Sequence, residues 1–182
     1  GYYNFNHGSY GSLPKSVWNT QQDYTAVMEA RPDPWFRGGY QAVLQMVRSR
    51  LAAYLSANTD DVVLVENASS GVNSVLRSLG ISTLRNKAVL YLSTAYAMVP
   101  NTLRYLAAHE PISLIQANVT FPLKNGGSDI VSLVQQTLQH TASNSVKLCV
   151  FSHVTSVPSV VLPIAELASV CKSAGALVLI DG

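Results

Sequence analysis

Three short apolar runs constrain the fold of this chain more than any other feature of its sequence. They cover residues 87–93, 146–152 and 176–180, are rich in Val, Leu and Ile, and each leads into polar residues. Runs of this kind are typical of parallel strands that are buried on both faces of a sheet. Ligands of such sheets bind outside the carboxyl ends of the strands, so we expect the functional residues there.

Helical patterns lie between and before these runs. The clearest covers residues 163–174, with Pro163 in its first turn and Gly175 as its stop. A second helix is predicted to begin at Ser128, a suitable N-cap, and a third to cover residues 34–55. Strands that alternate with helices predict an α/β fold with an open, mostly parallel sheet.

Composition and charge exclude several classes of protein. With 48% hydrophobic and 12% charged residues, the chain is too apolar for a disordered protein. Its formal net charge of +2 comes from scattered side chains, so no nucleic-acid partner is expected. The longest apolar runs are far shorter than the roughly 20 residues of a membrane helix, so no membrane partner is expected either.

The cysteines and the N-terminus bear on the cellular location. Cys149 falls in a predicted buried strand and Cys171 on the apolar side of a predicted helix. Paired extracellular cysteines are therefore not expected. A reducing, cytoplasmic location is expected instead. The first residues carry no signal peptide, and Gly1 stands where an initiator Met would be, so the true start is expected to lie upstream.

Small polar residues at positions 67–71 open a predicted helix after the apolar stretch 62–65. Hydroxyl and free backbone N–H groups at a helix start can bind a phosphate, with support from the helix dipole. The alternative is that these residues are ordinary N-caps. The glycine motifs of dinucleotide and P-loop sites do not occur in the chain. The apolar face of this helix is predicted to carry Val72, Val75, Leu76 and Leu79.

An acidic residue, Asp181, comes directly after the apolar run 176–180. A carboxylate at the mouth of a buried strand needs a partner, and a protonated pyridine nitrogen would supply one. The alternatives are that Asp181 caps a turn or binds a metal.

Two more segments place polar or aromatic side chains at strand ends. In the segment 152–156, hydroxyls could bond a cofactor oxygen, and His153 could act as an acid, a base or an orienting group. Tyr96, beyond the run 87–93, could cover a flat cofactor. The alternatives are a structural histidine and a packing tyrosine. The other histidines lack the spacing of metal ligands, so no metal site is expected.

Four segments in order resemble the class V aminotransferase family of pyridoxal-phosphate (PLP) enzymes, within it the isopenicillin N epimerase-like and cysteine C–S lyase-like branch. The resemblance covers nearly the whole chain and is carried by residues 5–11, 67–73, 152–164 and 175–182. It implies the PLP-dependent transferase fold type I. It also implies an N-terminal lead-in segment, 1–32, and a partial PLP-binding large domain, 33–182.

The resemblance assigns roles to individual residues. It implies that Ala68 and Ser69 hold the cofactor phosphate, that Tyr96 stacks on the ring, that Ser156 with Thr155 lies near the ring hydroxyl, and that Asp181 pairs with the pyridine nitrogen. It implies a substrate-side position for Asn6, His7, Gly8 and Ser9, and an accessory role for His153.

Family members continue past the pair matched by Asp181 and Gly182, and some two dozen residues later they carry the lysine that forms the Schiff base with PLP. No lysine of this chain occupies that position, so the chain resembles an enzyme cut off before its catalytic lysine. The large-domain sheet is then incomplete at the C-terminus. We therefore expect this polypeptide alone to be inactive and poorly soluble, because strand edges stay unpaired.

The resemblance implies an enzyme that acts on an amino-acid substrate through an external aldimine, with C–S lyase or epimerase-like chemistry, and that forms a homodimer. The alternative is a catalytically inactive truncated homologue or gene-model fragment. A nucleotide-binding Rossmann-like domain would fit the alternation of strands and helices, but the glycine fingerprint is missing.

Overall fold

The computed structural model describes residues 1–80, 82–143 and 145–182. The chain divides into two compact units, a helical unit, Gly1–Leu64, and a sheet unit, Val65–Gly182. The predicted boundary between a lead-in segment, 1–32, and a partial large domain, 33–182, differs from this division and stays a prediction. No helix of the described residues is long and apolar enough to cross a bilayer.

The helical unit contains more regular structure than the sequence predicts. The predicted helix over 34–55 is present, with a π-helical start at Trp35–Gly39, but the helix over residues 15–30 was not predicted. The elements of this unit are α1 (His7–Tyr10), α2 (Lys15–Ala30), α3 (Pro32–Pro34), η1 (Trp35–Gly39), α4 (Tyr40–Leu55) and η2 (Thr59–Asp61). Arg48 ties α4 to η2, since its guanidinium donates to the carbonyl oxygens of Thr59 and Val62 at 2.9 and 2.8 Å.

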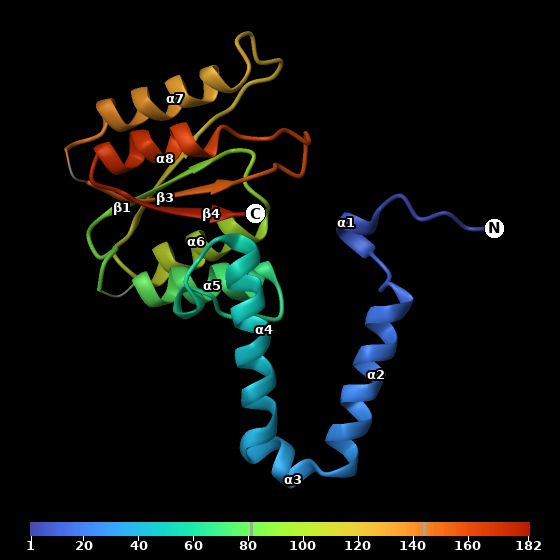
Figure 1. Cartoon of the computed structure of the whole chain (residues 1–182). Coiled ribbons are helices and arrows are strands. Elements are labelled where there is room, and N and C mark those ends of the chain that lie inside the picture. The colour runs from blue at the N-terminus through green and yellow to red at the C-terminus, as the bar shows by residue number, and fades with distance from the viewer. Residues whose placement is uncertain (81, 144) are drawn as a thin grey trace. The chain divides into compact units, whose positions relative to one another are not determined.

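A four-stranded parallel sheet forms the centre of the sheet unit (Figure 1), with the strand order β2-β1-β3-β4. The strands are β1 (Ala88–Leu92), β2 (Ser113–Ala117), β3 (Val146–Ser152) and β4 (Leu177–Asp181). The three predicted strands are confirmed as β1, β3 and β4. The edge strand β2 was not predicted, because its partly exposed sequence, Ser-Leu-Ile-Gln-Ala, lacks a continuous apolar run.

Helices cover both faces of this sheet. In Figure 1, α7 (Gly127–His140) and α8 (Ile164–Ser173) lie on one face, and α5 (Ala68–Gly80) and α6 (Met98–His109) on the other. Side chains of β1 alternate between the two layers, so that Leu90 packs in the cluster under α7 and α8 and Val89 in the cluster under α5 and α6. This three-layer arrangement explains why every residue of β1 is buried.

Two local expectations for the helices were wrong. Ser128 is not an N-cap, because α7 begins at Gly127 and Gly126 precedes it with a positive φ of 61°. The side chain of Asp129 closes the preceding loop instead, by accepting hydrogen bonds from the backbone N–H groups of Lys124 and Asn125 at 2.7 and 2.9 Å. These hydrogen bonds, with that from Asn125 first, lower the pKa of Asp129.

Val75, the second exception, was expected on the apolar face of α5 but is 40% exposed. Val72 and Leu76, which are four residues apart and so lie one above the other on the helix, are buried instead. The buried stripe of α5 is therefore narrower than the sequence pattern indicates.

Both cysteines are free and buried, as predicted. Cys149 of β3 and Cys171 of α8 belong to the same core cluster. The hydrogen bond between the two thiols, together with burial, raises the pKa of the Cys149 thiol, so this thiol stays protonated at neutral pH.

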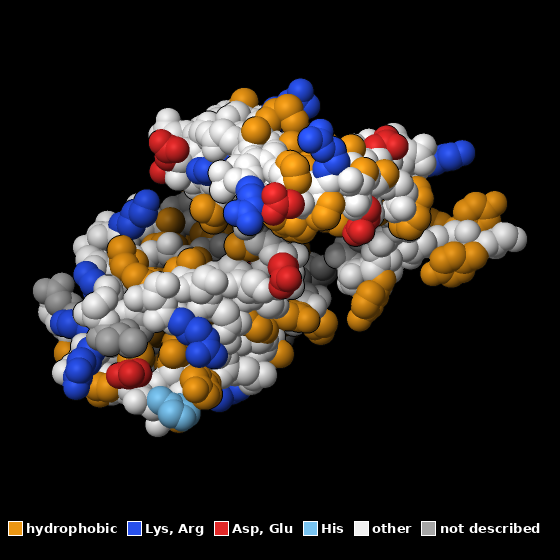
Figure 2. Space-filling model, turned by 90° about the horizontal axis from the view of Figure 1, so that it is seen from below, with side chains coloured by type: hydrophobic (Ala, Val, Ile, Leu, Met, Phe, Trp, Pro, Cys, Tyr) orange, Lys and Arg blue, Asp and Glu red, His pale blue; other side chains and the backbone are white. Residues whose placement is uncertain are grey.

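The surface carries both signs of charge. On the face seen in Figure 2, Lys and Arg side chains are interspersed with acidic and apolar ones. This distribution matches the small formal net charge of +2.

Two valines of α5 test this account of the core. Val72→Ala removes buried methyl groups and is expected to lower the free energy of unfolding by about 1.5–3 kcal/mol. Val75→Ala, the matched control on the same helix, is expected to change it by less than about 0.5 kcal/mol. Urea denaturation followed by circular dichroism measures both, and equal losses would contradict the observed burial.

Candidate functional site

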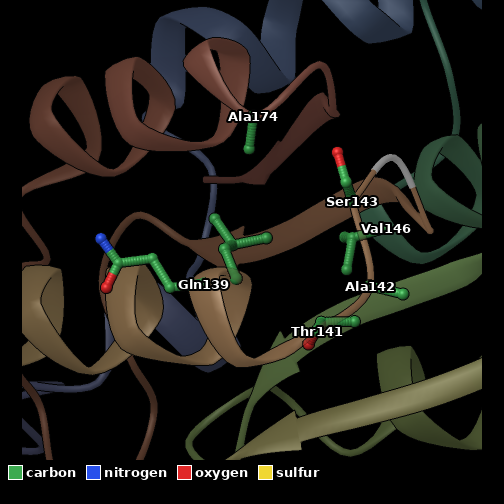
Figure 3. Close-up of a pocket in the computed structure, with 7 residues that line it drawn as sticks. Gln139, Thr141, Ala142, Ser143, Val146 and Ala174 are labelled. Carbon is green, nitrogen blue, oxygen red and sulfur yellow. The ribbon is translucent and has the colours of Figure 1, made fainter.

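Two of the cavities in the sheet unit lie at opposite ends of the strands. The first, about 280 Å³, is lined by Leu138, Gln139, Thr141, Ala142, Ser143, Val146 and Ala174 (Figure 3). Val146 is the first residue of β3, so this cavity lies at the amino end of the sheet. None of its lining residues is acidic or basic, and it therefore offers no group for acid–base or ionic chemistry.

The second cavity, about 240 Å³, lies at the carboxyl ends of β3 and β4, where the topology predicts the site. We call it the strand-end cavity. Its lining residues are Ala68, Ser69, Tyr96, Met98, Ser152, Val154, Ser156, Asp181 and Gly182. Five of the predicted cofactor-binding positions are therefore brought together in one place, from segments far apart in the sequence.

The start of α5 forms one wall of the strand-end cavity. Asn67 caps the helix, because its Oδ1 accepts a hydrogen bond from the backbone N–H of Ser70 at 2.8 Å. Ala68 and Ser69 form the first turn, where backbone N–H groups have no acceptor within the helix. The cap interpretation thus holds for Asn67, while Ala68 and Ser69 remain available to an anion at the positive end of the helix dipole.

Asp181 also lines the cavity. It is the last residue of β4, its register partner on β3 is Ser152, and its backbone carbonyl accepts a hydrogen bond from the N–H of His153 at 2.7 Å. Partial burial raises the pKa of its carboxyl group. Within the described residues the carboxylate has no cationic partner, so it is suited to receive a cation from a ligand.

Thr155, predicted to lie near a cofactor hydroxyl, does not line the cavity. Its side chain is only 1% exposed, and its hydroxyl is used within the loop. Thr155 Oγ1 donates to the carbonyl oxygen of Pro158 and accepts from the backbone N–H of Val160 at 3.1 Å. Thr155 therefore fixes the loop, and its neighbour Ser156 is the residue that lines the cavity.

Tyr96 and His153 occupy different positions relative to the cavity. Tyr96 lines it and is 54% exposed, so its ring is accessible to a flat ligand. His153 is exposed and does not line the cavity, although its side chain lies beside Gly182, where an added Cβ would come within 3.1 Å of His153 Cβ. Its accessory role stays a prediction.

The four predicted substrate-side residues lie in the helical unit. Asn6 precedes α1, and its carbonyl accepts from the N–H groups of Ser9 and Tyr10 at 3.2 and 2.9 Å. His7, Gly8 and Ser9 form the first three residues of α1. Their contact with a substrate stays a prediction. No group of three His, Cys, Asp or Glu side chains suited to a metal occurs among the described residues of either unit.

Sequence reasoning missed part of the lining. Met98 begins α6, a helix that was not predicted, so no local signal placed it near the site. Ser152 and Val154 lie in the segment 152–156, for which the sequence predicts cofactor contacts. Only the structure shows that every second residue of this segment, Ser152, Val154 and Ser156, lines the cavity. The isolated bridge between Val154 and Val161 turns the chain back after β3 and sets that geometry.

The family model described as Aminotransferase class-V matches residues 2–182. The chain belongs to this family. It is 31% identical over 183 residues to the L-cysteine desulfhydrase-like protein lolT1 of Epichloe uncinata, covering 100% of this chain and 39% of that protein. It is 26% identical over 179 residues to isopenicillin N epimerase of Streptomyces clavuligerus, covering 98% of this chain and 43% of the epimerase. The chain thus spans about two fifths of the length of these relatives.

Solved structures support the fold assignment. A complex of the cystine C–S lyase C-DES with its product cysteine persulfide matches with a TM-score of 0.81 at 20% identity, over 98% of this chain and 46% of the lyase. A cysteine desulfurase from Thermococcus onnurineus NA1 matches with a TM-score of 0.64 at 19% identity, over 75% of this chain and 32% of that one. The predicted fold, that of PLP-dependent fold type I enzymes, is confirmed for this class V chain.

The loop role of Thr155 can be tested by conservative substitutions. Thr155→Val keeps the shape but leaves the N–H of Val160 without its partner, so we expect a loss of about 1–3 kcal/mol in the free energy of unfolding. Thr155→Ser keeps the hydroxyl and should lose less than half as much. Chemical denaturation of the three proteins measures the difference, and a Val variant as stable as the parent would refute the role.

Proposed function

We propose that the complete protein binds PLP in the strand-end cavity and acts on an amino-acid substrate, with cleavage of a C–S bond as its reaction. One observation carries this proposal. A helix start bearing a hydroxyl, an accessible aromatic ring and a carboxylate without a cationic partner in the described residues meet in one cavity. The L-cysteine desulfhydrase-like relatives support the choice of reaction.

The lining fits the cofactor group by group. The N–H groups of Ala68 and Ser69, with the Ser69 hydroxyl, suit a phosphate dianion at the positive end of α5. Tyr96 offers an aromatic face to the ring, and the Ser156 hydroxyl can bond the ring hydroxyl. Asp181 suits the protonated ring nitrogen.

Bound PLP supplies an electron sink for carbanion chemistry at the substrate. The part of Asp181 in this is to hold a proton on the ring nitrogen, because an ionised carboxylate beside that nitrogen favours its charged form. Partial burial of Asp181 strengthens the interaction, since water screens it less than at the surface. Ser69, at the phosphate, and Ser156, at the ring hydroxyl, fix the orientation of the cofactor in the cavity.

Other functional groups would come from outside the sheet unit. No lysine is among the described residues that line the strand-end cavity, and we propose that the amine that holds PLP covalently and moves the substrate proton comes from elsewhere in the complete protein. Asn6, His7, Gly8 and Ser9 are the candidates for substrate contacts. We also propose a homodimer in the cytoplasm, as the buried free thiols of Cys149 and Cys171 are compatible with a reducing compartment.

The two alternatives to C–S bond cleavage are epimerisation and cofactor binding without turnover. Similarity to isopenicillin N epimerase supports epimerisation at the α-carbon. The second alternative is an inactive homologue that binds the cofactor without turnover, since the described residues that line the cavity include Ser69, Tyr96 and Asp181 for cofactor binding but no lysine.

Product analysis of the complete protein separates these functions. Incubation with PLP and L-cysteine or L-cystine is expected to release pyruvate together with sulfide or persulfide. Inversion of an amino-acid substrate without pyruvate would indicate an epimerase instead. Neither product, with PLP bound, would indicate an inactive homologue.

Asp181→Asn tests the cofactor site. The variant cannot carry the negative charge that faces the ring nitrogen, so PLP affinity is expected to fall about tenfold or more, as measured by fluorescence titration. Ser78→Ala, at an exposed position of α5, is the control and should bind PLP normally. Unchanged PLP affinity in Asp181→Asn would contradict the proposed pairing.

The same variant has a predicted effect on the cofactor-free protein. Because burial raises the pKa of Asp181 in the folded state above its ordinary value of 3.8, ionisation of this group opposes folding at neutral pH, and this cost declines as the pH falls below the folded-state pKa and is gone below 3.8. Asp181→Asn is therefore expected to match or exceed the parent in thermal stability at pH 7. The difference should shrink at acidic pH, and a variant that is less stable at pH 7 would contradict this sign.

A further inference from the structure

A chain of polar contacts joins the first turns of α5 and α6 beside the strand-end cavity. Asn73 Nδ2 donates to the carbonyl oxygen of Ser69 at 3.0 Å and to the Sδ atom of Met98 at 3.4 Å. Thr102 Oγ1 donates to Asn73 Oδ1 at 3.1 Å. We call these four residues the α5–α6 polar bridge. Two of them, Ser69 and Met98, line the cavity, and the other two lie behind it.

The bridge is built from groups that a helix interface normally excludes. Thr102 is buried, with 8% of its surface exposed, and Asn73 is partly buried. An amide at such a place destabilises the fold unless its hydrogen-bonding groups are satisfied. Here both the donor and the acceptor end of the Asn73 side chain have partners, so its orientation is fixed.

The two ends of the Asn73 amide act on different parts of the molecule. The Thr102 hydroxyl holds Oδ1, and this directs the NH₂ group towards Ser69 and Met98. The bond to the Ser69 carbonyl restrains the first helical turn from inside α5, while Asn67 restrains it from the other side through the N–H of Ser70. Helix ends fray unless they are held, and an anion site made of backbone N–H groups needs a fixed direction.

We propose that Asn73 is a positioning residue, oriented by Thr102, that fixes the start of α5 against the start of α6 and so sets the phosphate-binding geometry of the strand-end cavity. The inference rests on the proposed function, because it assigns the phosphate of PLP to this helix start. Asn73 itself does not line the cavity. Asn73 influences only the phosphate end of the cavity. It therefore contributes to the affinity for PLP and not to the affinity for the same ring without a phosphate.

The test compares PLP with pyridoxal, which has the same ring without the phosphate. Affinities of the complete protein for both compounds are measured by fluorescence titration, with thermal melting of the cofactor-free protein as a check on folding. Asn73→Asp keeps the side-chain shape but has no NH₂ group to donate. PLP affinity is expected to fall about tenfold, and pyridoxal affinity less than about twofold.

Neutral and matched variants separate positioning from charge. Thr102→Val removes the hydroxyl that orients the amide and adds no charge, so PLP affinity should fall by about three- to tenfold. Thr102→Ser restores the hydroxyl and should recover most of that loss. Asn101→Asp introduces the same substitution at an exposed position of α6 and should leave the PLP-to-pyridoxal affinity ratio unchanged.

The outcomes distinguish this inference from the proposed function. An equal loss of PLP and pyridoxal affinity, or a Thr102→Val protein that melts lower but binds PLP normally, would overturn the positioning role of Asn73. If Ser69→Ala and Asp181→Asn also leave PLP affinity unchanged, the proposed function fails and this inference fails with it. Weaker PLP binding in those two variants with normal binding in Asn73→Asp would overturn this inference alone.

Discussion

The parallel pairing of β1, β3 and β4 is the constraint on which the rest of the sheet unit depends. Because all strands run the same way, their carboxyl ends meet at one edge, and the register sets Ser152 directly beside Asp181. Helices on both faces bury β1 and β3 and leave that edge accessible. The strand-end cavity is therefore a consequence of topology, which brings the strand ends and the start of α5 to this edge.

Polar contacts in loops and helix ends give this edge its detailed shape. Thr155 closes the turn after β3, Asp129 closes the loop before α7, and Asn73 joins α5 to α6. Each of these side chains is hydrogen-bonded to groups of its own loop or of a neighbouring helix. Apolar packing thus fixes the layers, and a small number of hydrogen bonds fixes the direction of the residues that line the cavity.

The electrostatics of the strand-end cavity are divided between its walls. The positive end of α5 lies on one side and the partly buried carboxylate of Asp181 on another. A ligand with an anionic group at one end and a cationic ring at the other complements this division. PLP with a protonated ring nitrogen has that charge distribution, and this agrees with membership of the aminotransferase class-V family.

The sequence by itself determined three of the four strands, the helices of residues 34–55 and 163–174, and the positions of Ser69 and Asp181 at the ends of their elements, because apolar runs and helix signals are local. Only the tertiary structure decided the remaining features. Edge strand β2 depends on pairing with β1, and the exposure of Val75 depends on the width of the α5–α6 contact. The hydroxyl of Thr155 is hydrogen-bonded within its own loop because a buried polar group needs a partner. The sequence pattern does not reveal which partner is near.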